Sequence, residues 1–231
     1  MSGDEQAHSQ GTPPTRASRH VVHRSEAAAV TLRLPQLVWR VLVPLLVLDQ
    51  LIKVWVKTGF TVGERMDFIP GLLELQFIEN EGMAFGWALP GVAGKLVLTG
   101  FRLVAAVGIG WYIQKRVVER APNGLLIALT CVWAGAMGNI IDSAVYGQLF
   151  GRSGWATLAT FLPEDGGYAP WFQGHVVDMF HFVVTWPSWF PIEAMAGREV
   201  FPPIWNLADA AISVSVIWML IKQRTYFPSE R

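Results

Sequence analysis

The stretch Gly124–Ile141, GLLIALTCVWAGAMGNII, decides the fold class because it carries no charged residue over its whole length. A helix needs about 20 mostly apolar residues to cross the hydrocarbon core of a membrane. A second stretch, Ile204–Ile221 or IWNLADAAISVSVIWMLI, has Asp209 as its one charged residue. We therefore interpret both stretches as membrane spans, and the chain as an integral membrane protein.

Two further stretches qualify as spans although they carry more charge. Residues 35–56 include Asp49 and Lys53, and residues 96–113 include Arg102. The long Arg102 side chain is expected either to reach the membrane interface or to face the other helices. The predicted fold class is an all-α membrane protein with four transmembrane helices. Their expected ranges are 35–56, 96–113, 124–141 and 204–221.

Lysine and arginine residues indicate the orientation, since cytoplasmic loops are enriched in them. They gather near both chain ends and between the second and third spans, whereas the long loops 58–95 and 143–203 hold few. Both termini are therefore expected in the cytoplasm and both long loops outside. We divide the chain into a disordered cytoplasmic tail (1–34), a membrane domain (35–224) and a cytoplasmic C-terminal tail (225–231).

The external loops are expected to contain a small amount of β structure. Leu73, Leu75 and Phe77 alternate with other residues, and this period of two is typical of a strand with one apolar face. Residues 151–174 are rich in glycine, proline and aromatic residues and show no period. We interpret them as an irregular excursion along the membrane surface.

Polar residues from separate parts of the chain reach one depth in this topology, at the outer membrane face. An ionisable residue in the apolar zone costs about 2.5–3.5 kcal/mol on insertion scales, so Asp209 needs a partner from elsewhere in the fold. The residues that meet at this depth are Asp49, Asn80, Gly82, Asn139, Asp142, Asp178, Asn206 and Asp209.

Two carboxylates in a poorly solvated site favour hydrolytic chemistry. They cannot easily both ionise, so one takes a proton from water while the other donates a proton to a scissile carbonyl. This chemistry needs no cofactor and no metal, and the sequence has no zinc-ligand set, serine elbow or phosphate loop. The formal net charge is zero, which gives no reason to expect nucleic acid. Spacing alone leaves open whether Asp142 or Asp178 is the partner of Asp209.

Five sequence blocks in order resemble those of bacterial lipoprotein signal peptidase (signal peptidase II), in its long-loop subgroup. The resemblance covers about residues 41–221, nearly everything after the tail. The blocks are Asp49–Lys53 (DQLIK), Ile78–Gly86 (IENEGMAFG), Gly135–Asp142 (GAMGNIID), Val176–Phe180 (VVDMF) and Trp205–Asp209 (WNLAD).

The resemblance implies a fold, an activity and a location. The fold is four transmembrane helices with a small external antiparallel β-cradle and a membrane-surface loop or helix. The implied enzyme is an aspartic endopeptidase of the bacterial cytoplasmic membrane, with its active site near the outer face. It removes the signal peptide of diacylglyceryl-modified prolipoproteins by cleaving on the N-terminal side of the lipid-modified cysteine. The implied partners are these prolipoproteins, membrane lipid and globomycin-type inhibitors.

The resemblance also implies roles for individual residues. Asp178 and Asp209 match the catalytic pair, and Asp49 and Asp142 match supporting acidic positions. Asp49 and Lys53 lie four residues apart on one helix face, so we expect them to pair. The residues that match substrate-lining positions are Asn80, Gly82, Asn139, Asn206 and Ala208.

One departure and two alternatives accompany this interpretation. Ser143 stands where the family usually has an arginine, so a contact to substrate or inhibitor is lost or comes from another group such as Arg152. A proton-coupled transporter is one alternative, and it predicts polar residues in the cytoplasmic halves of the spans. A catalytically inactive lipoprotein-binding protein is the other, and it predicts loss of a catalytic carboxylate.

Overall fold

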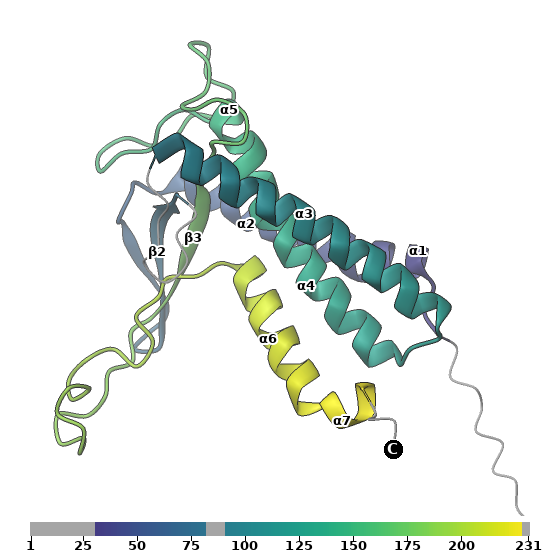
Figure 1. Cartoon of the computed structure of the whole chain (residues 1–231). Helices are drawn as coiled ribbons and strands as arrows, with labels where there is room; N and C mark the ends of the chain where they lie inside the picture. The colour runs from purple at the N-terminus through teal and green to yellow at the C-terminus, as the bar shows by residue number, and fades with distance from the viewer. Residues whose placement is uncertain (1–30, 82–90, 228–231) are drawn as a thin grey trace, which may run out of the picture. The chain divides into compact units, whose positions relative to one another are not determined.

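The computed structural model describes residues 31–81 and 91–227, which form helices and one small sheet (Figure 1). Gly82 and most of the expected N-terminal tail lie outside the described residues. The helices are α1 (Leu34–Leu37), α2 (Val43–Gly59), α3 (Gly91–Val118), α4 (Asn123–Ile141), α5 (Gly147–Leu149), α6 (Leu207–Ile221) and α7 (Gln223–Tyr226). Two π-helical segments are η1 (Val38–Leu42) and η2 (Asp142–Tyr146), and the strands are β1 (Arg65–Ile69), β2 (Leu73–Asn80) and β3 (Val176–Phe182).

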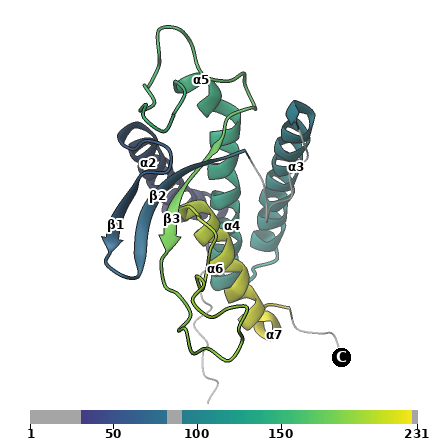
Figure 2. The ribbon, with the colours of Figure 1, turned by 90° about the vertical axis from the view of Figure 1, so that its left-hand side faces the viewer.

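Helix α4 is the centre of the helical part. It contacts α2, α3 and α6, and Figure 2 shows α4 between α2 and α3 with α6 in front of it. Two helical stretches, Val92–Val118 and Asn123–Leu149, are long and apolar enough to cross a membrane, and α6 is apolar but shorter. The predicted spans at 96–113 and 124–141 therefore correspond to helices of sufficient length.

The helix that begins at Leu34 continues through Gly59 by way of η1, and Pro44 explains the change in winding. Proline has no backbone N–H and cannot complete the ordinary hydrogen bond to the residue four positions earlier. Val43 N–H instead donates to the carbonyl of Val38, five residues back, as in a π-turn. The expected first span is thus a single helical run with a local change of pitch.

Residues next to both expected tail boundaries are packed against the helices. Leu32 N–H donates to Asn123 Oδ1 at 2.8 Å, so packing begins before residue 35. At the other end, Tyr226 is buried in α7 and its hydroxyl accepts a hydrogen bond from Trp218 Nε1 at 2.9 Å. The expected boundary at residue 224 therefore falls inside a packed helix.

Two glycines let α4 approach its neighbours closely. A Cβ on Gly135 would collide with the main-chain carbonyl of Ala208, and a Cβ on Gly138 would lie 2.5 Å from Asp49 Oδ2. Small residues at helix contacts are a usual way to bring membrane helices together. The contact places the start of α6 and the polar face of α2 against the C-terminal half of α4.

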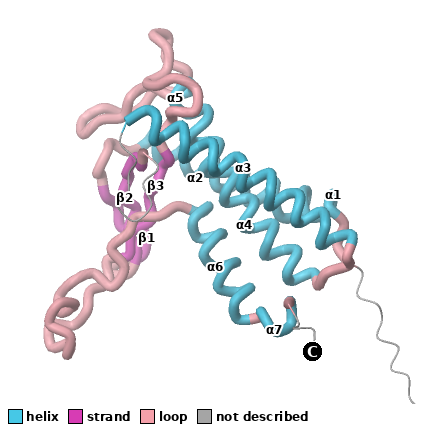
Figure 3. Tube along the Cα trace, in the orientation of Figure 1, coloured by secondary structure: helices cyan, strands magenta, loops and turns pink. Residues whose placement is uncertain are grey.

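The three strands form one antiparallel sheet in the order β1-β2-β3 (Figure 3). The predicted strand at Leu73–Phe77 is part of β2, with Leu75 and Phe77 buried as expected. Its other face is also covered, because buried Glu74 pairs with Arg65 and hydrogen-bonds His181. The sequence analysis did not predict β3, which contains Asp178.

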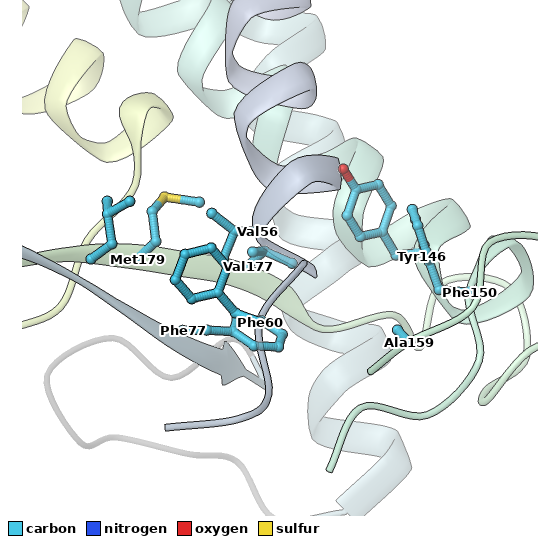
Figure 4. Close-up of a cluster of buried hydrophobic side chains, with 9 residues drawn as sticks. Val56, Phe60, Phe77, Tyr146, Phe150, Ala159, Val177 and Met179 are labelled. Atoms are coloured by element: carbon cyan, nitrogen blue, oxygen red, sulfur yellow. The ribbon is translucent and has the colours of Figure 1, made fainter. Parts of the chain in front are cut away.

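A hydrophobic core joins the sheet to the helices at the end of α2 (Figure 4). The buried side chains come from α2 and the residue after it, the sheet, η2 and the loop that follows α5. They are Val56, Phe60, Leu75, Phe77, Tyr146, Phe150, Ala159, Val177 and Met179. This core fixes β3 against the helices, and so it fixes the position of Asp178.

The long segment between α5 and β3 is irregular, as expected for 151–174. Its regular features are isolated bridges, Phe150 with Phe161 and Gly154 with Thr157. Residues 183–206 form a second extended loop beyond the sheet, seen in pink in Figure 3. Between 150 and 206, all of which the structure describes, there is no helix, so the surface element here is a loop.

Candidate functional site

A short bridge between β3 and Trp205, two residues before α6, brings Asp178 and Asp209 to the same part of the structure. Phe180 N–H donates to the carbonyl of Trp205 at 2.7 Å, and Trp205 N–H donates back to the carbonyl of Phe180 at 3.0 Å. Asp178 lies two residues before this bridge and Asp209 four residues after it. The pairing therefore fixes the first turn of α6 beside the strand.

Asn206 is the N-cap of α6 and connects both carboxylates. Its side-chain oxygen accepts from Asp209 N–H at 2.9 Å, and its own main-chain N–H donates to Asp209 Oδ2 at 3.3 Å, which is a capping box. Its side-chain amide donates to Asp178 Oδ1 at 2.6 Å. One asparagine thus hydrogen-bonds Asp178 with its side chain and Asp209 with its backbone.

Asp178 is buried on β3, with 3% of its surface exposed. Burial, followed by the nearby charge of Asp209, raises the pKa of Asp178 to about 7. Hydrogen bonds from Asn80 Nδ2 at 3.1 Å and from Asn206 oppose this rise, because they favour the carboxylate. Asp178 can therefore exchange a proton near neutral pH.

Asn139 on α4 links Asp209 to the polar residues of α2. Its amide donates to Asp209 Oδ1 at 2.9 Å, which gives Asp209 the partner from another helix that the sequence analysis required. Its oxygen accepts from Lys53 Nζ at 2.9 Å and from Asn206 Nδ2 at 3.2 Å. The Asn139 side chain therefore joins α2, α4 and α6.

Lys53 occupies the middle of a buried ion-pair network. Its ammonium lies 2.9 Å from Asp49 Oδ2 and 2.8 Å from Asp142 Oδ2, and none of the three side chains is more than 2% exposed. The expected Asp49–Lys53 pair is present. The other carboxylate oxygen of Asp49 accepts from Ala208 N–H at 3.0 Å, and Asp142 Oδ2 accepts from Val177 N–H at 3.3 Å.

These contacts separate the four aspartates into two groups. Asp49 and Asp142 are both paired with Lys53 and accept hydrogen bonds from the backbone of α6 and β3. Asp178 and Asp209 instead receive hydrogen bonds from asparagine side chains and from the Asn206 backbone. Asp209 is partly exposed, so it is the more accessible of this second group.

Two further residues belong to the network but were missed in the sequence analysis. Gln50 Nε2 donates to Asp49 Oδ2 at 3.1 Å and to Asp142 Oδ1 at 3.0 Å, while its oxygen accepts from Tyr146 OH at 3.0 Å. An uncharged amide within an apolar span was the available signal, because such groups also need partners in a membrane.

Arg102 reaches from α3 to η2, the segment that continues α4. Its Nη1 donates to Ser143 Oγ at 3.2 Å, and Ser143 Oγ donates to the carbonyl of Asn139 at 2.9 Å. The charges of Asp209, Asp142 and Asp178 all act on the guanidinium. Arg152, which the sequence analysis offered as a substitute cation, is exposed in the loop after α5.

A second polar cluster joins the loop after α5 to the ends of α2 and β2. Glu79 forms an ion pair with buried Lys57 and accepts from Ser153 Oγ at 3.0 Å, and His175 Nδ1 lies 3.1 Å from Glu79 Oε2. Burial alone would raise the pKa of Glu79, but His175 and Lys57 outweigh it and lower this pKa to about 2. Glu79 therefore stays ionised and holds β2 to the start of β3.

Over residues 31–81 and 91–227, no three His, Cys, Asp or Glu side chains are grouped as metal ligands.

Apolar helices that enclose linked carboxylates define a membrane-embedded protein with groups suited to proton transfer. The sequence model of the family described as "Signal peptidase (SPase) II" matches residues 41–225, well over half of the chain. The chain therefore belongs to the signal peptidase II family, which is a family of peptidases.

Similar proteins agree with this assignment. A protein of Porphyromonas gingivalis named "Lipoprotein signal peptidase" is 41% identical over 196 residues, covering 82% of this chain and 84% of the relative. One of the same name from Amoebophilus asiaticus is 30% identical over 186 residues, covering 77% and 73%. Two solved structures described as a "Bacterial membrane enzyme" share the fold. They have TM-scores of 0.56 and 0.57, identities of 21% and 20%, and cover 87% and 84% of this chain and 96% and 95% of their own.

Proposed function

We propose that this chain is an intramembrane aspartyl endopeptidase that removes the signal peptide from diacylglyceryl-modified prolipoproteins. The observation that carries the proposal is the double role of Asn206, which donates to Asp178 through its side chain and to Asp209 through its backbone. Two carboxylates held by one residue, one of them with a pKa of about 7, suit the sharing of a single proton.

The proposed reaction uses the two carboxyl groups in complementary roles. The partly exposed Asp209 carboxylate takes a proton from water as the water oxygen attacks the scissile carbonyl carbon. Protonated Asp178 donates its proton to the carbonyl oxygen, which gives a gem-diol. The C–N bond then breaks as Asp209 returns a proton to the leaving nitrogen and a gem-diol hydroxyl returns one to Asp178. Both carboxyl groups regain their starting states.

The substrate class follows from the relatives, which are named lipoprotein signal peptidases. We propose cleavage on the N-terminal side of the lipid-modified cysteine, in the bacterial cytoplasmic membrane, with the site near the outer face. Four spans with both termini in the cytoplasm are part of the same proposal, as is inhibition by globomycin-type compounds. The long apolar helices Val92–Val118 and Asn123–Leu149 support a site within the membrane.

The substrate is proposed to lie against the residues around the carboxyl pair. Ala208 packs its methyl group toward Gly138, and its N–H donates to Asp49. Its proposed contribution is therefore an apolar contact rather than a hydrogen bond. The asparagines keep the carboxylates oriented as the peptide enters. The proposed lining residues are Asn80, Gly82, Asn139, Asn206 and Ala208.

Exchange of each carboxyl group for an amide tests the proposed pair. Cells depleted of their own lipoprotein signal peptidase would express the full chain, and a diacylglyceryl prolipoprotein would be followed by its gel shift on cleavage. Asp178→Asn and Asp209→Asn should each abolish processing, because an amide neither takes nor donates the required proton. Asp67→Asn, on the exposed edge strand β1, is the matched control and should process normally.

The membrane content of each variant must be measured in parallel. Processing that survives in Asp178→Asn or Asp209→Asn at normal membrane level would contradict the aspartyl mechanism. Failure of the unmodified chain to process any lipoprotein, at normal membrane level, would contradict the proposed substrate class.

A further inference from the structure

Arg102 is a charged residue within an apolar stretch of helix α3. Residues 96–113 within α3 are otherwise uncharged, and an arginine in the apolar zone costs about 2.5–3.5 kcal/mol on insertion scales. Its side chain is partly buried and reaches η2, the segment that continues α4, where it meets Ser143. Such residues usually serve a function, so the position of the guanidinium requires an explanation.

The guanidinium is anchored at one point and has donors to spare. A guanidinium carries five N–H donors. In the described part of the chain, one hydrogen bond from Arg102 is recorded, from Nη1 to Ser143 Oγ at 3.2 Å, and no carboxylate lies within ion-pair distance of it. Asp209, Asp142 and Asp178 nevertheless act on its charge, so it lies beside the site without being neutralised there.

The charge balance of the site indicates which kind of ligand the remaining N–H donors of Arg102 would bind. Arg102 contacts Ser143 on η2 and is acted on by the charges of Asp142 on η2, Asp178 on β3 and Asp209 on α6. Asp142 is in turn paired with Lys53 of α2, which also pairs with Asp49. Four carboxyl groups against two cations disfavour an anionic ligand. A neutral acceptor, such as the main-chain carbonyl of an extended peptide, fits better and still gains a charge-assisted hydrogen bond.

We propose that Arg102, held in place by Ser143, is a substrate-positioning residue that donates to a main-chain carbonyl beside the scissile bond. This inference rests on the proposed peptidase function. Ser143 thus has a role of its own in this chain, because it orients the guanidinium of Arg102, which lies on α3. The guanidinium supplies binding and register, while the carboxyl groups carry out the proton transfers.

Steady-state kinetics on the full-length protein in detergent micelles test the proposal. The substrate is a synthetic diacylglyceryl-cysteine peptide with a fluorescent reporter. Arg102→Gln should raise KM about 10- to 100-fold with kcat within a few-fold, which is the loss expected for a charge-assisted hydrogen bond made to bound substrate. Arg102→Lys keeps the charge but not the planar fork, so its KM should lie between those of the wild type and Arg102→Gln.

Ser143→Ala and the double variant test the link between the two residues. Ser143→Ala alone should raise KM by a smaller factor, because the guanidinium loses its anchor. In the Arg102→Gln background the same change should add nothing, so the double variant should match Arg102→Gln. Arg40→Gln removes an exposed arginine of η1 and is the control, with KM expected unchanged.

The outcomes separate this inference from the proposed function. An active wild type with an unchanged KM in Arg102→Gln would overturn the positioning role and leave the peptidase proposal intact. A fall in thermal midpoint with no change in KM, or additive effects of Arg102→Gln and Ser143→Ala, would also overturn it. A wild type that does not cleave the lipopeptide would overturn the proposed function itself.

Discussion

At the residue scale, the site is defined by how its buried charges are partnered. Lys53 lies within 2.9 Å of Asp49 and 2.8 Å of Asp142, and it also donates to Asn139. Buried ion pairs are costly unless further hydrogen bonds satisfy their remaining atoms, and here backbone N–H groups of Ala208 and Val177 do so. The same bonds that satisfy the carboxylates therefore hold α6 and β3 in place.

Asn80 gives a residue-scale prediction about pH. Its hydrogen bond to Asp178 favours the ionised form and opposes the effects of burial and of Asp209, so Asn80→Ala should raise the pKa of Asp178 further above about 7. The proposed reaction needs a proton on Asp178, and it is lost as the pH rises through this pKa. The alkaline limb of a kcat–pH profile should therefore move to higher pH in Asn80→Ala.

The comparison needs a variant that leaves the Asp178 hydrogen bonds intact. Asp165→Asn, in the exposed loop after α5, should keep the wild-type profile. An alkaline limb that moves to lower pH in Asn80→Ala, or that does not move, would contradict the role given to Asp178 as proton donor.

At the element scale, the helices were predictable and the junctions between them were not. Hydropathy alone identified α3 and α4, because a long apolar run with little charge has few other uses. Strand β3 was missed because its residues, VVDMFHF, are followed by a long loop, and its pairing with β2 is set by tertiary contacts. Local sequence could not decide between Asp142 and Asp178 for the same reason. The two residues differ in their partners, because Lys53 contacts Asp142 whereas two asparagines contact Asp178.

Gly135 gives an element-scale prediction. In Gly135→Ala the new methyl group would meet the main-chain carbonyl of Ala208 and lie 2.8 Å from Ile212 Cγ1. Because backbone cannot rotate away, α4 and α6 must separate, at a cost of about 1–3 kcal/mol for overpacking. We expect a lower thermal midpoint in detergent and reduced processing, since Asn139 and Asp209 lie on these two helices.

A helical glycine without neighbours provides the matched control. A Cβ on Gly108 of α3 meets nothing within 4 Å, so Gly108→Ala should be neutral or stabilising by up to about 1 kcal/mol through helix propensity. Equal thermal midpoints for Gly135→Ala and Gly108→Ala would show that the close approach of α4 and α6 does not limit stability.

At the scale of the described part of the molecule, sheet and helices depend on one another at both ends of β3. The start of the strand is held by His175 with the Glu79–Lys57 pair and by the Asp142 carboxylate, which accepts from Val177 N–H. Its C-terminal half is held by the bridge between Phe180 and Trp205. The long-loop segment takes part through Ser153, so it is a structural support of the site. None of this was readable from the sequence, because each contact joins residues distant along the chain.

The membrane topology gives the prediction at the largest scale, and α6 is its critical element. Helix α6 has 15 residues, or about 22 Å at 1.5 Å per residue, against a hydrocarbon core of about 30 Å. It can still cross if its N-terminal end, with Asp209, lies below the outer surface of the core. Four spans then require Glu164 outside the cell, and both Glu119 and Arg224 in the cytoplasm.

Cysteine labelling distinguishes this topology from one in which only α3 and α4 cross. The chain has a single cysteine, Cys131, so Cys131→Ala provides a cysteine-free background. In intact cells a membrane-impermeant maleimide should label Glu164→Cys, whereas Glu119→Cys and Arg224→Cys should react only after permeabilisation; all three positions are exposed in the structure. Labelling of Arg224→Cys from outside would mean that α6 does not cross. Asp209 would then face the aqueous exterior, which would contradict the proposal of a proton-sharing carboxyl pair within the membrane.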